Sequence, residues 1–179
     1  MSSILALIIA TIAEIAINAV FGKMPILEPY TITLNIVFIT ALLVTYKDKL
    51  LPSILFTLVV GTIVDLYNPT QWLLLVSIYT MCMLIVRLWS QLINYSIVEM
   101  TFTILAAVLI KEIMMYLYYT MVVGVDLNFN VYVLTFLTPT LIINLMITII
   151  CVIIKKIIIE KDIYQQRRQG RRGSFDNRY

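Results

Sequence analysis

Long apolar runs, separated by short polar breaks, are the feature of this sequence that most restricts its fold. A helix that crosses a bilayer needs about 20 consecutive apolar residues. Hydrophobic residues make up 61% of the chain and charged residues only 13%. The mean hydropathy of +0.98 is far from that of soluble domains. The sequence therefore predicts an integral membrane protein of the all-α class.

The breaks divide the chain into six candidate transmembrane helices. The second and third are short, so a bundle of five helices with a merged or re-entrant segment is the alternative. We expect a polytopic helical bundle over residues 1–156 and a basic, disordered cytoplasmic tail over residues 157–179. The six segments are Ile4–Phe21, Thr31–Tyr46, Leu51–Leu66, Trp72–Trp89, Ile97–Thr120 and Tyr132–Ile154.

The positions of lysine and arginine predict the orientation, because short loops rich in these residues stay in the cytoplasm. With six helices and an inside N-terminus, the outside loops hold only Lys23. The inside segments hold Lys47, Lys49, Arg87 and the eight basic residues from Lys155 to Arg178. Both termini are therefore expected in the cytoplasm. The tail is expected to contact anionic membrane lipids or a cytoplasmic partner, and no nucleic acid is expected.

Few residues of this sequence could carry out catalysis. Histidine is absent, which removes the usual zinc or haem ligand and the usual general base near neutral pH. Cys82 and Cys151 lie in apolar runs without a CxxC partner, so neither a disulfide nor a metal site is predicted. We expect no catalytic residue, no metal and no cofactor.

Besides Asp65, five charged residues lie inside or at the ends of the candidate helices, where a charge is costly enough to suggest a role: Glu14, Arg87, Glu99, Lys111 and Glu112. Lys111 and Glu112 are adjacent, so on a helix their side chains point about 100° apart and each needs a partner elsewhere. We expect Lys111 to pair with Glu14 near mid-membrane, either to fix helix packing or within a proton or substrate path. Near the cytoplasmic side, we expect Arg87 to pair with Glu99.

Two pairs of residues combine a helix-shaping residue with a polar one. Gly61 and Asp65 share one face of the third candidate helix. We expect Asp65 to be solvated or to engage another helix, because the C-terminal end of its own helix does not favour a carboxylate. Asn68 is the expected N-cap of the following helix. In the last candidate helix, Pro139 predicts a kink and Asn144 an interhelical hydrogen bond.

Taken in order along the chain, these landmarks resemble a known family of bacterial membrane proteins. The segment LPSILFTLVVGTIVDLYNP carries Gly61, Thr62 and Asp65, where the rod shape-determining MreD family typically has a Gly-Leu-x-x-Asp pattern. The segment TPTLIINLMITIICVIIKK carries Pro139 and Asn144 before a basic tail, and is similar to the last helix of that family. The resemblance covers most of the chain.

Resemblance to MreD implies a non-catalytic scaffold in the bacterial cell membrane that helps to organise peptidoglycan synthesis and cell shape. The implied direct partner is an MreC-like bitopic membrane protein. The implied indirect partners are an MreB-like cytoskeleton, a RodA-like glycosyltransferase and a penicillin-binding protein. Candidates for packing or for partner contact are then Gly61, Asp65, Pro139 and Asn144.

The membrane domain of MreD-like proteins is also similar in fold to the substrate-binding subunits of energy-coupling-factor vitamin transporters, which gives an alternative function. Those subunits carry an Ala-x-x-x-Ala pattern in their first helix, and Ala6 and Ala10 match it. A scaffold needs no small ligand. A vitamin-binding subunit needs a polar and aromatic pocket near its outer side, so a copurifying ligand discriminates between the two functions.

Overall fold

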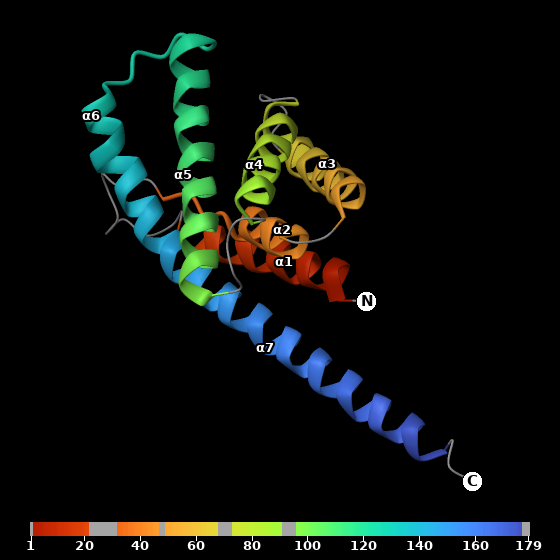
Figure 1. Cartoon of the computed structure of the whole chain (residues 1–179). Coiled ribbons are helices and arrows are strands. Elements are labelled where there is room, and N and C mark those ends of the chain that lie inside the picture. Colours follow the sequence, from red (N-terminus) through yellow and green to blue (C-terminus); the bar gives the residue numbers. More distant parts are fainter. Residues whose placement is uncertain (1, 22–31, 47–48, 68–72, 91–95, 177–179) are drawn as a thin grey trace.

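The structure, a computed structural model, describes residues 2–21, 32–46, 49–67, 73–90 and 96–176 (Figure 1). Within these ranges the regular secondary structure is helical and no strand occurs, so the predicted all-α class is confirmed. The elements are α1 (Ser2–Phe21), α2 (Ile36–Thr45), α3 (Leu50–Tyr67), α4 (Leu74–Ser90), α5 (Ile97–Met121), α6 (Phe129–Tyr132), the π-helix η3 (Val133–Leu137) and α7 (Thr138–Asp176).

Helix α2 is the centre of the packing, because it contacts α1, α3, α4, α5 and α7. Its sequence, IVFITALLVT, is apolar on every side, as a helix surrounded by other helices requires. The Phe38 ring lies 4.6 Å from the Tyr79 ring of α4, measured between centroids. Ile39 and Leu42 are almost completely excluded from solvent. The core of the protein therefore centres on a short helix and extends to buried residues of α4, α5 and α7.

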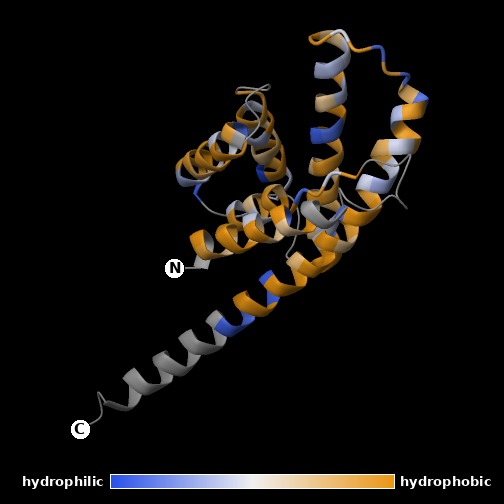
Figure 2. Cartoon of the chain, turned by 180° about the vertical axis from the view of Figure 1, so that it is seen from behind, coloured by the Kyte–Doolittle hydropathy of each residue, from blue (hydrophilic) through white to orange (hydrophobic). Residues whose placement is uncertain are grey.

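Large apolar side chains cover the outer surfaces of the surrounding helices. Figure 2 shows that hydrophobic residues predominate along most of the described helices. Ile4 of α1, Phe102 of α5 and Ile142 of α7 are among the most exposed. Of the helices in the described ranges, the continuous run Phe129–Lys161 is long and apolar enough to cross a membrane by length and composition. The apolar segments of α1, α2, α3 and α4 in these ranges are shorter than that requirement.

The second candidate transmembrane helix, predicted over Thr31–Tyr46, is only partly helical. Residues 32–35 are extended, and the helix begins at Ile36. At about 1.5 Å per residue, α2 is about 15 Å long, which is half the thickness of the hydrocarbon core of a bilayer. The polar groups of the extended residues bond to side chains of other helices instead of to their own helix.

The last helix begins earlier and ends later than the sequence predicted. Helical structure starts at Phe129 and continues through η3 and α7 to Asp176, across the segment expected to be a disordered tail. Lysine, arginine, glutamine and glutamate favour helices, and continuing an existing helix avoids the cost of nucleation. The π-helical turn lies directly before Pro139, whose missing N–H and bulky ring disturb regular α-helical hydrogen bonding.

Candidate functional site

The extended residues before α2 form hydrogen bonds with two side chains of α7, and one of these, Asn144, bonds as a peptide group would. The Asn35 backbone N–H donates to Asn144 Oδ1 at 2.9 Å, and Asn144 Nδ2 donates to the Thr33 carbonyl oxygen at 2.8 Å. The Thr33 N–H donates to Thr140 Oγ1 at 3.2 Å. Because an unpaired backbone group is costly in an apolar interior, these bonds are what allow a non-helical segment there.

A polar stripe along α7 provides these partners. Thr140, Asn144 and Thr148 follow one another at intervals of four, so they share one helix face, and each has 0% of its surface exposed. Asn144 Nδ2 also donates to the Thr140 carbonyl oxygen, and Thr148 Oγ1 donates to the Asn144 carbonyl oxygen. The stripe is thereby fixed in orientation toward the start of α2. Asn144 thus bonds the extended backbone before α2, where the sequence predicted an interhelical hydrogen bond.

The side chain of Asn35 connects this stripe to the two buried charges of α5. Lys111 Nζ donates to Asn35 Oδ1 at 2.7 Å, and Asn35 Nδ2 donates to Glu112 Oε1 at 2.9 Å. Lys111 and Glu112 also form an ion pair of 2.9 Å, with 6% and 2% of their side chains exposed. We call Asn35, Lys111, Glu112 and Asn144 the polar cluster.

The expected Lys111–Glu14 pair is replaced by the pair between neighbours. The prediction that adjacent side chains point apart was wrong here, because the long, flexible lysine stem bends back along the helix and Asn35 holds both charged ends together. In the part of the chain that the structure describes, Lys111 forms its ion pair with Glu112. The buried charges of α5 therefore neutralise each other.

Glu14 instead stabilises the first turn of α2 from outside. Its Oε2 accepts a hydrogen bond of 2.7 Å from the Val37 N–H. A helix N-terminus has unpaired N–H groups and a partial positive charge, so a carboxylate is favourable there. Glu14 comes from α1, and the side chain of Asn35, at the N-cap position itself, makes no capping bond. The start of α2 is thus capped by another helix.

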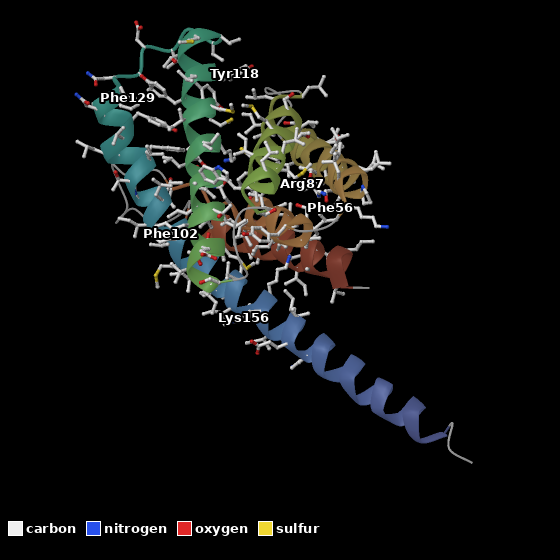
Figure 3. All side chains as sticks on the ribbon, in the orientation of Figure 1. Phe56, Arg87, Phe102, Tyr118, Phe129 and Lys156 are labelled. Atoms are coloured by element: carbon white, nitrogen blue, oxygen red, sulfur yellow. The ribbon has the colours of Figure 1, made fainter. Side chains whose placement is uncertain are left out.

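Tyr132 links the hairpin of α5 and α6 to the polar cluster. Its hydroxyl donates to the Glu112 carbonyl oxygen at 3.0 Å. Its ring lies 4.7 Å from the Tyr116 ring and 5.1 Å from the Phe136 ring, between centroids. In Figure 3, Phe129 lies on the same hairpin, toward the loop that joins α5 to α6. Aromatic packing therefore holds α6 and η3 against α5 next to the buried charges.

A second capped helix start lies between α3 and α4. Asp65 has only 3% of its surface exposed. Its Oδ1 accepts a bond of 3.1 Å from the Leu75 N–H and its Oδ2 one of 3.0 Å from the Val76 N–H. The carboxylate therefore caps the N-terminus of α4, the positive end of that helix. Asn68, the expected N-cap, lies outside the described residues, and α4 begins at Leu74.

Gly61 allows the two helices to approach at this point. A Cβ atom on Gly61 would lie 2.7 Å from Val76 Cα, closer than real contacts allow. Gly61 and Asp65 thus contact the same turn of α4, one by its lack of a side chain and the other through its carboxylate. The face that they share packs inside this chain.

Arg87 and Glu99 do not form the expected pair. Glu99 Oε2 is buried without a hydrogen-bond partner among the described residues, and no ion pair joins it to Arg87 in the described ranges. Arg87 lies in the last turn of α4 and Glu99 in the first turn of α5. Each charge is therefore at the helix end where the helix dipole favours it. Figure 3 shows Arg87 on α4.

Several residues of the site were missed by the sequence analysis. Thr33 and Asn35 were assigned to a continuous helix, and Thr140 and Thr148 were not considered. Polar residues at intervals of four within an apolar helix were the available signal for the stripe on α7. Nothing local in the sequence signals that Asn35 contacts α5, because those residues are more than 70 positions apart.

The polar cluster connects α5 and α7 to the extended segment before α2. The polar cluster bonds within itself and to the backbone of the chain. No group of three His, Cys, Asp or Glu side chains that could hold a metal ion occurs in the part of the chain that the structure describes. Comparison of the chain with protein-family models, curated protein sequences and solved structures gives no match. The function is therefore inferred from these contacts and from the sequence pattern.

Proposed function

We propose that this protein is a polytopic, non-catalytic membrane scaffold that binds an MreC-like bitopic partner and helps to organise peptidoglycan synthesis in the bacterial cell membrane. The proposal depends on one observation: the polar residues of the Gly61–Asp65 and Pro139–Asn144 motifs form hydrogen bonds within the chain. Asp65 caps α4 and Asn144 bonds the backbone before α2. Side chains that serve internal packing in this way point to a protein whose task is to hold a shape.

The outer surface supports the membrane part of the proposal. Exposed side chains such as Ile12, Leu51 and Ile150 belong to three different helices, and surfaces of this kind need lipid or protein cover. The buried charges of Lys111 and Glu112 form an ion pair, as charged residues inside a membrane usually do. In this setting α1, α3, α4, α5 and the run from α6 to α7 cross or enter the bilayer, while α2 stays in the middle.

Binding of a single-span partner would use ordinary helix packing. In lipid, helices associate through van der Waals contact and interhelical hydrogen bonds, each worth about 0.6–2 kcal/mol. A rigid bundle presents such a surface without a cost of ordering it on binding. The caps on α2 and α4 supply that rigidity, so they act on partner binding indirectly.

The test is affinity purification of the tagged chain in mild detergent, with mass spectrometry of both proteins and small molecules. We expect a bitopic membrane protein encoded in the same genome, together with its cell-elongation partners, and no bound vitamin. Recovery of a stoichiometric vitamin with a coupling subunit, and without the bitopic protein, would establish the transporter alternative instead.

A matched pair of substitutions tests whether shape carries the interaction. Gly61→Leu should reduce recovery of the bitopic partner, because the new side chain meets the backbone of α4 at Val76. Thr62→Leu places the same side chain on the exposed neighbouring position and should leave the bundle intact. Full recovery of the partner with Gly61→Leu, at unchanged bundle stability, would contradict the proposed dependence on this packing.

A further inference from the structure

Helix α6 and the π-helix η3, residues 129–137, are attached to the molecule more loosely than the helix that continues from them, and we call them the flap. Figure 1 shows α6 beside the upper part of α5, joined to it by the loop that follows Met121. Helix α5 packs closely along α7, but its backbone makes at most marginal contact with the flap. Leu137 is the one buried residue of the flap, all of which the structure describes. Val131 and Leu134 are 55% and 67% exposed.

Tyrosine side chains, rather than close backbone packing, hold the flap against α5. The Tyr132 hydroxyl donates to the Glu112 carbonyl oxygen at 3.0 Å. In the opposite direction, the Tyr116 hydroxyl of α5 donates to the Leu127 carbonyl oxygen at 3.0 Å, just before α6. The Tyr116 ring lies 4.7 Å from the Tyr132 ring and 5.4 Å from the Phe129 ring, between centroids. These side-chain contacts keep the flap closed.

The flap meets α7 at Thr138 and Pro139, where regular α-helical bonding is interrupted, and we call these two residues the joint. Pro139 has no N–H, so it cannot donate to the Thr135 carbonyl oxygen four residues before it. The Thr138 N–H donates to the Val133 carbonyl oxygen, and the Thr138 hydroxyl donates to the same oxygen at 2.8 Å. Helices bend at prolines and π-turns, and a threonine hydroxyl can satisfy a carbonyl at such a site. The joint can therefore bend while the Val133 carbonyl stays paired.

The other end of the flap is free to follow such a bend. Every residue of the loop over 122–128 is exposed. Gly124 has φ of 76°, a conformation that glycine adopts without strain, and a Cβ atom there would meet nothing within 4 Å. Asn128 Oδ1 accepts from the Asn130 N–H at 3.0 Å and so caps α6. The loop can thus move, while the cap keeps the start of the flap helical.

We propose that the flap swings away from α5 about the joint, between the closed state described above and an open state in which the tyrosine contacts are broken. Opening uncovers the Glu112 carbonyl oxygen and the Tyr116 ring. Because an unpaired carbonyl is costly in an apolar setting, the closed state is the more populated one. The flap thereby controls how closely solvent or another molecule can approach the polar cluster from the side of α6. The inference goes beyond the scaffold proposal, since the motion requires no partner.

The test measures the distance between two nitroxide labels on the full chain in nanodiscs, by double electron–electron resonance. The labels are coupled to ketone-bearing amino acids in place of Asn130 in the flap and Thr62 in α3, both exposed, so the native cysteines stay unchanged. Helices α3 and α6 lie on opposite sides of α5 (Figure 1), so opening lengthens this distance. Asn130 lies about 12 Å from Thr138 along the helix, so a bend of about 30° moves it by about 6 Å. We expect a major shorter distance and a minor longer one.

Three substitutions separate the contacts of the flap from the joint. Tyr132→Phe removes the hydrogen bond to Glu112 but keeps the ring, so it should raise the ratio of open to closed molecules about fivefold, the factor expected for one hydrogen bond. Tyr118→Phe is the matched control, because the Tyr118 ring packs on Tyr119 of the same helix, and it should leave the ratio unchanged. Pro139→Ala restores the missing N–H and should shift the molecules toward a single distance.

Two results would overturn the inference. One is the same single distance between the Asn130 and Thr62 labels in the wild type and in Tyr132→Phe. The other is an equal response to Tyr132→Phe when the first label is placed at Met146, an exposed position of α7 beyond the joint, because the whole helix would then move instead of the flap. Neither measurement includes a partner protein, so failure of this inference and failure of the scaffold proposal are distinguishable.

Discussion

Helices α2 and α4 each begin with backbone N–H groups that need an acceptor from outside the helix. The residues that supply the acceptors lie at different distances along the chain. In each, a carboxylate on another helix accepts from the first free N–H groups. The two carboxylates differ in position, because Asp65 lies only 10 residues before Leu75, whereas Glu14 lies 23 residues before Val37. The start of α4 is thus closed within one helical hairpin.

The start of α2 depends on the whole molecule. Besides Glu14 of α1, it uses Asn144 of α7, which is 109 residues from Asn35, and Glu112 of α5, which is 77 residues from Asn35. Three separate helices must be in place before these bonds can form. We infer that a substitution that removes the bonds at the start of α2 destabilises the whole bundle. A substitution that removes the bonds at the start of α4 destabilises only the α3–α4 hairpin.

Loss of the buried cation is expected to have the largest effect. Lys111→Met leaves Glu112 and its negative charge buried without the ion pair, which should cost about 3–5 kcal/mol of unfolding free energy. The measurement is unfolding by SDS in mixed micelles, followed by circular dichroism. Because replacing both partners of a buried pair is far less harmful, Lys111→Met/Glu112→Gln should recover most of the loss. A double variant as unstable as the single one would contradict a role of the ion pair.

Removal of the Asn144 amide is expected to have the second-largest effect on the free energy of unfolding. Asn144→Leu leaves the Asn35 N–H and the Thr33 carbonyl oxygen without their bonds, at a cost of about 2 kcal/mol, or roughly 1 kcal/mol for each group. Met146→Leu, on the exposed face of α7, is the matched control and should change the unfolding free energy little. Equal stability of the two variants would show that the extended segment does not depend on α7.

The cap of α4 is expected to contribute less, and locally. Asp65→Ala removes two hydrogen bonds from the first turn of α4, at a cost of about 1–2 kcal/mol. Hydrogen exchange should increase at the N-terminal turn of α4 and remain unchanged in α2 and α7. Increased exchange throughout the bundle would break the distinction between a local and a global helix start. Asp65→Asn, which keeps one acceptor, should lie between Ala and the wild type.

The sequence predicted the parts of the fold that depend on local composition. Apolar runs and polar breaks located most of the helices, and the spacing of Gly61 and Asp65 placed both on one face. Of the two alternatives for Asp65, solvation or contact with another helix, the structure shows the second. That this contact is a helix cap was not predicted, because only the dipole of its own helix was considered. A tight hairpin brings the start of the next helix beside the end of α3, where the dipole has the opposite sign.

The polar cluster could not be predicted because it depends on contacts between distant segments. The apolar run from Thr31 to Tyr46 has the composition of a continuous helix, and the extended residues 32–35 become favourable only through Asn144, Thr140 and Asn35's contacts with α5. The length of the last helix was underestimated because composition alone does not include the stability gained by extending an existing helix.

The smallest expected effect concerns the backbone at the start of α4 and is a gain. Leu73 has φ of 66°, a left-handed conformation that costs a residue with a Cβ about 1–2 kcal/mol. Leu73→Gly removes that cost but adds flexibility to the unfolded chain, so we expect a net gain of about 0.5 kcal/mol. Leu55→Gly, at an exposed position inside α3, should lose about 1 kcal/mol, and SDS unfolding measures both. Equal losses in the two variants would mean that Leu73 is not strained. A gain confined to Leu73→Gly would show that the start of α4 contains a strained residue that the contacts of the α3–α4 hairpin hold in place. The start of α2 is held instead by contacts with three other helices.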